Sequence, residues 1–112
     1  MATISVRKKG LLTVRIDQDV RPLSVRASGE IDISNARFLE EELRRAFSVD
    51  APLILLDLGK VDFIDSTGLR VLLWAAEHSR ENGNRLRIRN GSAAVRQVVE
   101  ASGVGRLLAM TD

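Results

Sequence analysis

The chain has 112 residues, a net formal charge of +2 and no cysteine. The length suits one domain, and a hydrophobic content of 45% is enough to bury a core without metal or disulfides. The lack of cysteine excludes a disulfide framework, a thiolate metal site and a cysteine nucleophile. The first residues do not resemble a signal peptide, and the apolar runs are too short to span a bilayer. We therefore expect one cytoplasmic domain over residues 1–112, with no membrane partner.

The basic residues are mostly arginine and are scattered along the sequence among the acidic ones. Nucleic-acid binders usually cluster such residues on one element. Aromatic residues make up only 4% of the chain, too few for a platform that stacks bases. The composition therefore predicts no direct binding of nucleic acid.

The first third of the chain is predicted to form strands. Apolar and polar residues alternate over 12–16 and again over 23–31, with a plausible hairpin connection between them at 17–22. The stretch 3–6 is expected to add a short edge strand. A sheet therefore begins in this region.

An amphipathic helix is predicted over residues 35–47, with Ser34 as its N-cap. Its apolar face holds Leu39, Leu43, Ala46 and Phe47. The apolar run 53–58 then predicts a central strand, which Gly59 and Lys60 are expected to break.

Helices and strands alternate in the second half of the chain. The expected order is a helix over 66–81, a strand over 85–89 with one basic face, a helix over 93–101, and a short helix or closing strand over 104–108. This alternation predicts an α/β fold: a mixed sheet with helices packed mainly on one face.

The turn 63–69 is the most informative segment, because an apolar strand runs through Asp65 and Ser66 directly into a helix. We expect Ser66 to act as the N-cap of that helix. The free N–H groups and positive dipole of a helix N-terminus suit an anion such as phosphate. Ser66 is therefore the candidate phosphate acceptor, with Thr67 as the second choice.

Two segments resemble the STAS domain, and within it the small single-domain anti-sigma factor antagonists of bacteria. One is Gly-Glu-Ile-Asp at 29–32, and the other runs from the strand at 55–58 through Asp-Ser-Thr-Gly-Leu at 65–69. The segment 98–104 is similar to the last helix and turn of the family. The resemblance covers nearly the whole chain and implies the STAS fold.

The resemblance also implies a binding module rather than an enzyme, without cofactor, metal or catalytic residues. In the family, the serine matching Ser66 is phosphorylated by a kinase that is also the anti-sigma factor. The unphosphorylated form binds this kinase and frees a sigma factor for transcription, for example in a stress response, and a serine phosphatase resets it. The alternative is a STAS subunit that acts as a scaffold in a stressosome-like or lipid-transport complex. A monomer or weak dimer is expected.

The expected partner surface surrounds Ser66 and follows one face of the second helix. A helical wheel places Leu69, Leu72, Leu73 and Ala76 on the core side. The candidate partner-binding residues are Asp32, Asp65, Ser66, Thr67, Gly68, Arg70, Val71 and Trp74. Two alternatives stay open: Gly68 could serve close packing, and Trp74 could pack on a neighbouring helix.

A hydrolytic site is not expected. Ser66 and His78 would stand about 18 Å apart along one helix, since each residue adds about 1.5 Å, so they cannot form a catalytic pair. The lone His78 also makes a metal site improbable. Asp65 is not expected to be a phosphate acceptor, because the chain has no lysine late in the sequence to complete a receiver-like site.

Overall fold

The computed structural model describes residues 3–89 and 91–111. It contains a five-stranded sheet in the spatial order in which its strands occur in the chain. The strands are β1 (Ile4–Lys9), β2 (Leu12–Asp17), β3 (Leu23–Ile31), β4 (Ile54–Ile64) and β5 (Leu86–Arg89). The helices are α1 (Ala36–Phe47), α2 (Ser66–Glu81), α3 (Ala93–Ser102) and α4 (Gly105–Leu108). The expected elements are therefore present, and the 104–108 segment is a helix.

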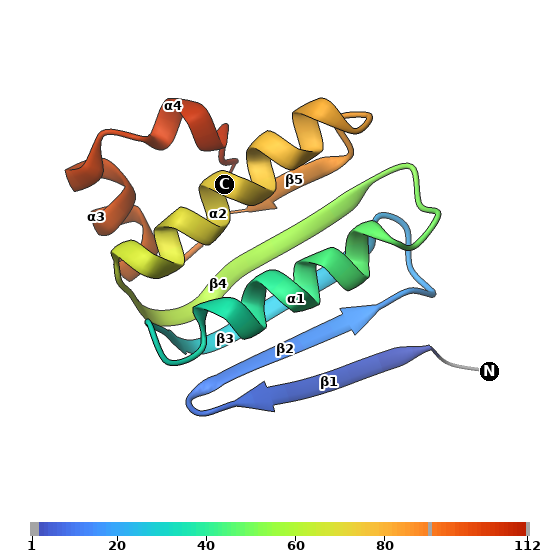
Figure 1. Ribbon diagram of the computed structural model, residues 1–112, viewed down its shortest axis with the longest axis horizontal. Coiled ribbons are helices and arrows are strands. Elements are labelled where there is room, and N and C mark those ends of the chain that lie inside the picture. The colour runs from blue at the N-terminus through green and yellow to red at the C-terminus, as the bar shows by residue number, and fades with distance from the viewer. Residues whose placement is uncertain (1–2, 90, 112) are drawn as a thin grey trace.

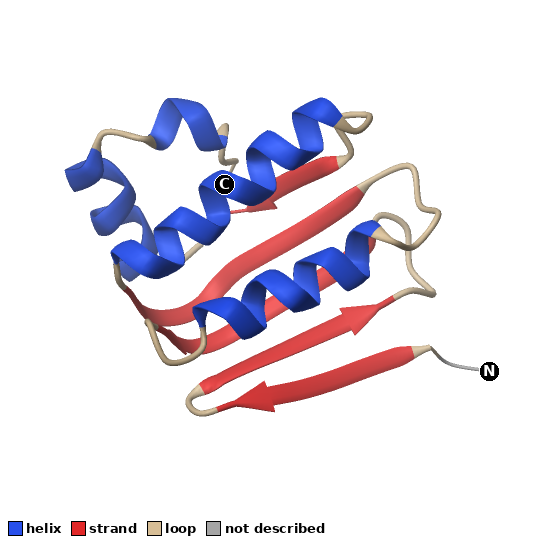
Figure 2. Cartoon of the chain, in the orientation of Figure 1, coloured by secondary structure: helices blue, strands red, loops and turns tan. Residues whose placement is uncertain are grey.

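The sheet is mixed, as the sequence predicts. β1, β2 and β3 pair antiparallel, whereas β3, β4 and β5 pair parallel. The parallel connections run through α1 and α2, which lie side by side in front of the sheet in Figure 1, with α4 beside α2 and α3 against β4. Figure 2 shows the same arrangement, with helices over one face of the strands. None of the helices in the described ranges is both long and apolar enough to cross a membrane.

The core lies between the sheet and the helices. Alternate residues of the strands, such as Val14, Val25 and Leu56, are completely buried on this side. Leu39 and Leu43 of α1 and Leu72 of α2 cover them and are also completely buried. Burial of one face of β2, β3, β4 and β5 fixes their register, because a shift by one residue would expose the apolar set. β1 has no buried face.

The start of α1 differs from the expectation. Asn35, not Ser34, occupies the N-cap position, and it makes no side-chain capping bond. The Ser34 hydroxyl instead donates to Asp32 Oδ1 at 2.5 Å. A short polar side chain can bond to its neighbours in several local geometries, so its type alone does not place a cap.

β4 continues through Gly59 and Lys60, so the predicted break is wrong. The pairing with β3 shifts register between Arg26 and Ser28 and again between Gly29 and Glu30. These irregularities absorb the extra residues of β4 while the strand continues to Ile64. Gly29 has a φ of +100°, and a Cβ there would stand 1.9 Å from the Leu11 carbonyl oxygen. The backbone at this point therefore requires glycine.

Candidate functional site

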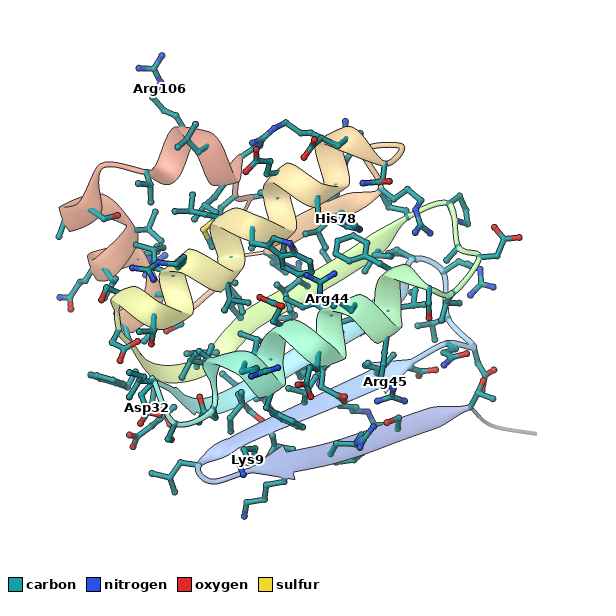
Figure 3. The ribbon with its side chains drawn as sticks, viewed as in Figure 1. Lys9, Asp32, Arg44, Arg45, His78 and Arg106 are labelled. Carbon is teal, nitrogen blue, oxygen red and sulfur yellow. The ribbon has the colours of Figure 1, made fainter. Side chains whose placement is uncertain are left out.

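The candidate site lies where β3 and β4 end side by side. Ile31 pairs with Ile64 at the last position of both strands, and the Asp65 N–H donates to the Ile31 carbonyl at 3.2 Å. The β3–α1 turn therefore adjoins the β4–α2 turn, and Figure 3 shows Asp32 in the former. Ligand sites of open α/β sheets commonly form at the carboxyl ends of parallel strands.

Asp65, not Ser66, is the N-cap of α2. Its Oδ1 accepts the backbone N–H groups of Thr67 at 3.0 Å and of Gly68 at 3.1 Å. Its backbone is extended, and Ser66 is already the first helical residue. The expectation that Ser66 caps this helix is therefore wrong. Two of the N–H groups that could have held an anion are already bonded to the Asp65 carboxylate.

The Ser66 side chain is exposed at this helix start. The neighbouring Thr67 is half-buried, and its hydroxyl donates to Asp65 Oδ1 at 2.5 Å. A partner could therefore reach the Ser66 hydroxyl directly, whereas the Thr67 hydroxyl is engaged in the turn. This difference favours Ser66 over Thr67 as an acceptor.

The environment of Asp65 keeps it ionised. Burial by itself would raise the pKa of Asp65, but hydrogen bonds from the Thr67 hydroxyl and from the backbone N–H groups of Gly68, Thr67 and Ile33 outweigh it. The pKa of Asp65 therefore lies below its ordinary value. A phosphate on Ser66 would stand next to this fixed negative charge.

Asp32 organises the adjoining turn. Its Oδ1 accepts the Ser34 N–H at 2.9 Å, and its own N–H donates to Asn35 Oδ1 at 3.0 Å. Asn35 is only 1% exposed and also donates to the Glu30 carbonyl at 2.9 Å. The sequence analysis missed Asn35, although a polar residue just before an amphipathic helix is a common sign of a structured turn.

Gly68 lets the first turn of α2 approach the sheet closely. A Cβ there would stand 2.6 Å from Ile31 Cγ2 and 2.8 Å from Ile64 Cγ1. Gly68 is buried, so of the two alternatives for this residue the geometry supports packing. The close approach holds Asp65 and Ser66 at the ends of the strands.

The outward face of α2 differs from the helical-wheel prediction. Arg70 is exposed, as expected, but Val71 is only 8% exposed and belongs to the core. Leu73, expected on the core side, is half-buried. α2 packs against the sheet on one side and against α1 on another, so its buried face is wider than a single stripe. The burial of Val71 therefore does not support a direct role for it in partner contact.

Trp74 packs on α1. Its ring lies edge-on to Phe47 with centroids 6.1 Å apart, and it stacks on His78 at 5.3 Å. The Arg44 guanidinium lies 4.4 Å from the Trp74 ring centroid. Figure 3 shows Arg44 and His78 between the two helices. The structure thus supports the packing alternative for Trp74, and His78 belongs to this aromatic cluster.

Two exposed apolar residues beside the site were not among the candidates from the sequence analysis. Ile33 is 79% exposed in the turn after β3, and Phe63 is 47% exposed near the end of β4. The available signal was a large apolar residue inside or next to a polar turn. Within residues 3–89 and 91–111, no group of three His, Cys, Asp or Glu side chains is placed to hold a metal ion.

The fold and this site describe a small α/β domain that offers the exposed Ser66 hydroxyl, fixed carboxylates and apolar side chains at a sheet end. The sequence profile of the STAS domain matches residues 12–112. The chain therefore belongs to the STAS domain family.

A relative found by sequence comparison is described as an anti-sigma factor antagonist. The Bordetella bronchiseptica protein BtrV, whose name describes it as an anti-sigma factor antagonist, is 37% identical over 75 residues. That match covers 67% of this chain and 65% of BtrV, slightly less than two thirds of the relative's length.

Two solved structures have the same fold. An anti-sigma factor antagonist from Mycobacterium paratuberculosis matches with a TM-score of 0.67 and 22% identity, over 98% of this chain and 85% of that one. The unphosphorylated form of the antagonist SpoIIAA matches with a TM-score of 0.69 and 24% identity, over 88% and 86%.

Proposed function

We propose that this protein is an anti-sigma factor antagonist that binds an anti-sigma serine kinase while Ser66 is unphosphorylated. The observation that carries the proposal is the exposed Ser66 hydroxyl at the start of α2, beside a turn that Asp65 caps. Membership of the STAS family and the description of BtrV support the same function. Binding of the kinase would release a sigma factor for transcription.

The partner surface in this proposal consists of both turns and the exposed side of α2. Ser66, Asp32 and Arg70 supply polar contacts, and Ile33 and Phe63 supply apolar area. Interfaces commonly combine an apolar centre with a polar rim. Asp65, Thr67 and Gly68 contribute mainly by holding the turn that presents Ser66.

Phosphorylation acts on this interface through charge. A phosphate adds about −1.5 to −2 charges at neutral pH. It would stand beside the Asp65 carboxylate, whose capping bonds already use the N–H groups of Thr67 and Gly68. These two N–H groups are therefore not free to compensate the phosphate, and the added charge must be desolvated when a partner binds. A serine phosphatase would restore the binding form.

The decisive experiment incubates the full chain with a candidate anti-sigma kinase and ATP, and measures phosphate incorporation by peptide mass spectrometry. We expect one phosphate on Ser66. Ser66→Ala should bind the kinase and stay bound after ATP is added, and Thr67→Val should still be phosphorylated. Incorporation into Ser66→Ala at the wild-type rate would refute the site assignment.

A further inference from the structure

The sheet face opposite α1 and α2 gathers basic residues that are far apart in the sequence. Its side chains alternate along each strand with those of the buried core. Six exposed cationic residues belong to it, and together they are called the basic face: Lys8, Arg15, Arg26, Lys60, Arg87 and Arg89.

The strand register brings these residues into neighbouring rows. Arg15 of β2 pairs with Arg26 of β3, Arg26 pairs with Asp57 of β4, and Asp57 pairs with Arg89 of β5. Cross-strand partners share a face and lie about 5 Å apart. The Arg26 Nε to Asp57 Oδ2 distance of 3.8 Å confirms the placement for that pair.

A second row joins Lys8 of β1, through Thr13 and Ser28, to Lys60 of β4. Arg87 of β5 lies beside Leu55 in a third row. Basic side chains are thus distributed over all five strands. The scatter seen in the sequence becomes a cluster in the fold, since each strand contributes one or two of them.

Charge on this face is not neutralised within the sheet. Three carboxylates occupy paired positions on the face, namely Asp17, Glu30 and Asp57, and exposed Asp62 lies in the β4 bulge beside it, against six cations. The excess is notable because the whole chain has a net charge of only +2. On α1, by contrast, Arg37 and Arg44 each pair with a glutamate one turn away. Directly opposed like charges such as Arg15 and Arg26 disfavour the folded state, so stability does not explain their placement.

We propose that the basic face binds an acidic segment of a partner protein. Four of its six cations are arginines, whose planar guanidinium matches a carboxylate with two parallel hydrogen bonds. Exposed Ile4 and Val6 of β1 point to the same side and add apolar area at its edge. Arginine together with apolar side chains is typical of protein interfaces.

Other polyanions fit this face less well. The basic residues lie on the face of a sheet, and no described element of that face projects so that it could enter a groove of duplex DNA. The one aromatic side chain of this face, Phe63, stands at the strand end near Ser66. An anionic membrane would call for a larger apolar surface than Ile4 and Val6 provide. The proposal does not depend on Ser66 or on its phosphorylation.

The test measures binding of the full chain to fluorescent polyglutamate at low salt. The test variant is Arg15→Gln with Arg89→Gln, and the matched control is Arg37→Gln with Arg96→Gln, exposed residues of α1 and α3. Both pairs change net charge equally. We expect the test variant to bind about tenfold more weakly and the control to remain within about twofold of wild type. Circular dichroism checks that both double variants are folded. If the test variant is not folded, the single substitution Arg15→Gln takes its place as the milder variant.

Four results would overturn the proposal. Absence of polyglutamate binding, or an equal loss in both double variants, would show that this face is not a specific acidic-protein site. Tighter binding to duplex DNA of equal charge would assign the face to nucleic acid. Tighter binding to vesicles of phosphatidylcholine and phosphatidylserine would assign it to a membrane surface.

Discussion

The carboxylate of Asp65 accepts the backbone N–H of Gly68 at 3.1 Å, so the residue before Ser66 caps α2. This bond separates two tasks that the sequence analysis had assigned to Ser66. Asp65 holds the helix start, and the exposed Ser66 is left available to a partner.

Removal of the cap should therefore cost stability, whereas removal of the exposed hydroxyl should not. We expect Asp65→Ala to lower the free energy of unfolding by about 1 kcal/mol, the usual cost of losing an N-cap. Ser66→Ala should stay within about 0.5 kcal/mol of wild type, as is usual for a surface substitution. Urea unfolding of the two variants measures both values, and a larger loss in Ser66→Ala would contradict the capping assignment.

The lowered pKa of Asp65 predicts a pH dependence of stability. The unfolded carboxyl titrates near its reference pKa of about 3.9 and the folded one below that value. The stabilisation is therefore fully present above the unfolded pKa and is lost as pH falls through the folded pKa. We expect the difference in free energy of unfolding between wild type and Asp65→Asn to be smaller at pH 3 than at pH 7. Urea unfolding of both proteins at the two pH values measures this difference. A larger difference at pH 3 than at pH 7 would contradict a lowered pKa of Asp65 in the folded protein.

Gly68→Ala tests the close approach of α2 to the sheet. Alanine favours a helix over glycine by about 1 kcal/mol, but its methyl group would overlap Ile31 and Ile64. Overpacking of a core typically costs about 1 to 3 kcal/mol, so we expect a net loss of stability. Gly105→Ala is the control, because its added Cβ would meet only Val99 Cγ1 at 3.3 Å. Equal thermal midpoints for Gly68→Ala and wild type would exclude tight packing here.

Arg70 and Val71 are neighbours with opposite expectations. Arg70→Glu should weaken binding of the anti-sigma kinase and leave the domain folded, since Arg70 is exposed. Val71→Asp should destabilise the fold strongly, as should Leu72→Asp, because both side chains belong to the core. Calorimetric binding and circular dichroism separate the two effects. Kinase binding by Arg70→Glu at wild-type affinity would remove α2 from the proposed interface.

Ser66→Asp imitates part of the effect of phosphate. A negative charge near a helix N-terminus is favourable, but Asp65 lies next to it, so we expect the thermal midpoint to remain close to wild type. Affinity for the kinase should fall because the charge must be desolvated in the interface. Ser66→Asn, of similar size and neutral, is the matched control and should bind more tightly than Ser66→Asp.

Local patterns in the sequence predicted most elements of the fold. The alternation of β2 and β3 and the bounds of α2 are confirmed, because period-two and helical patterns record which side of an element is buried. The turn containing Ser66 was also predicted at the correct place. Its cap was assigned to the wrong residue, because Asp65 and Ser66 are both good capping residues and only the backbone geometry distinguishes them.

Tertiary structure decided what depends on contacts between elements. Val71 and Trp74 looked like an outward stripe on α2, but Val71 is buried in the core and Trp74 is half-buried against α1. The sequence analysis did not single out Phe63 or Ile33, and only the structure shows that both are exposed beside the strand ends. The sequence pattern of a single helix or strand does not show which other elements will pack against its remaining sides.

The basic face also shows which features the sequence predicts and which depend on tertiary structure. The alternation of arginine in β5 is visible in the sequence, and it predicts one basic side for that strand. Only the pairing register places Arg15, Arg26 and Arg89 in one row across four strands. The sequence by itself thus determined the elements, the family and the candidate Ser66. The fold decided which side chains share a surface, because strand pairing brings together residues that are far apart along the chain.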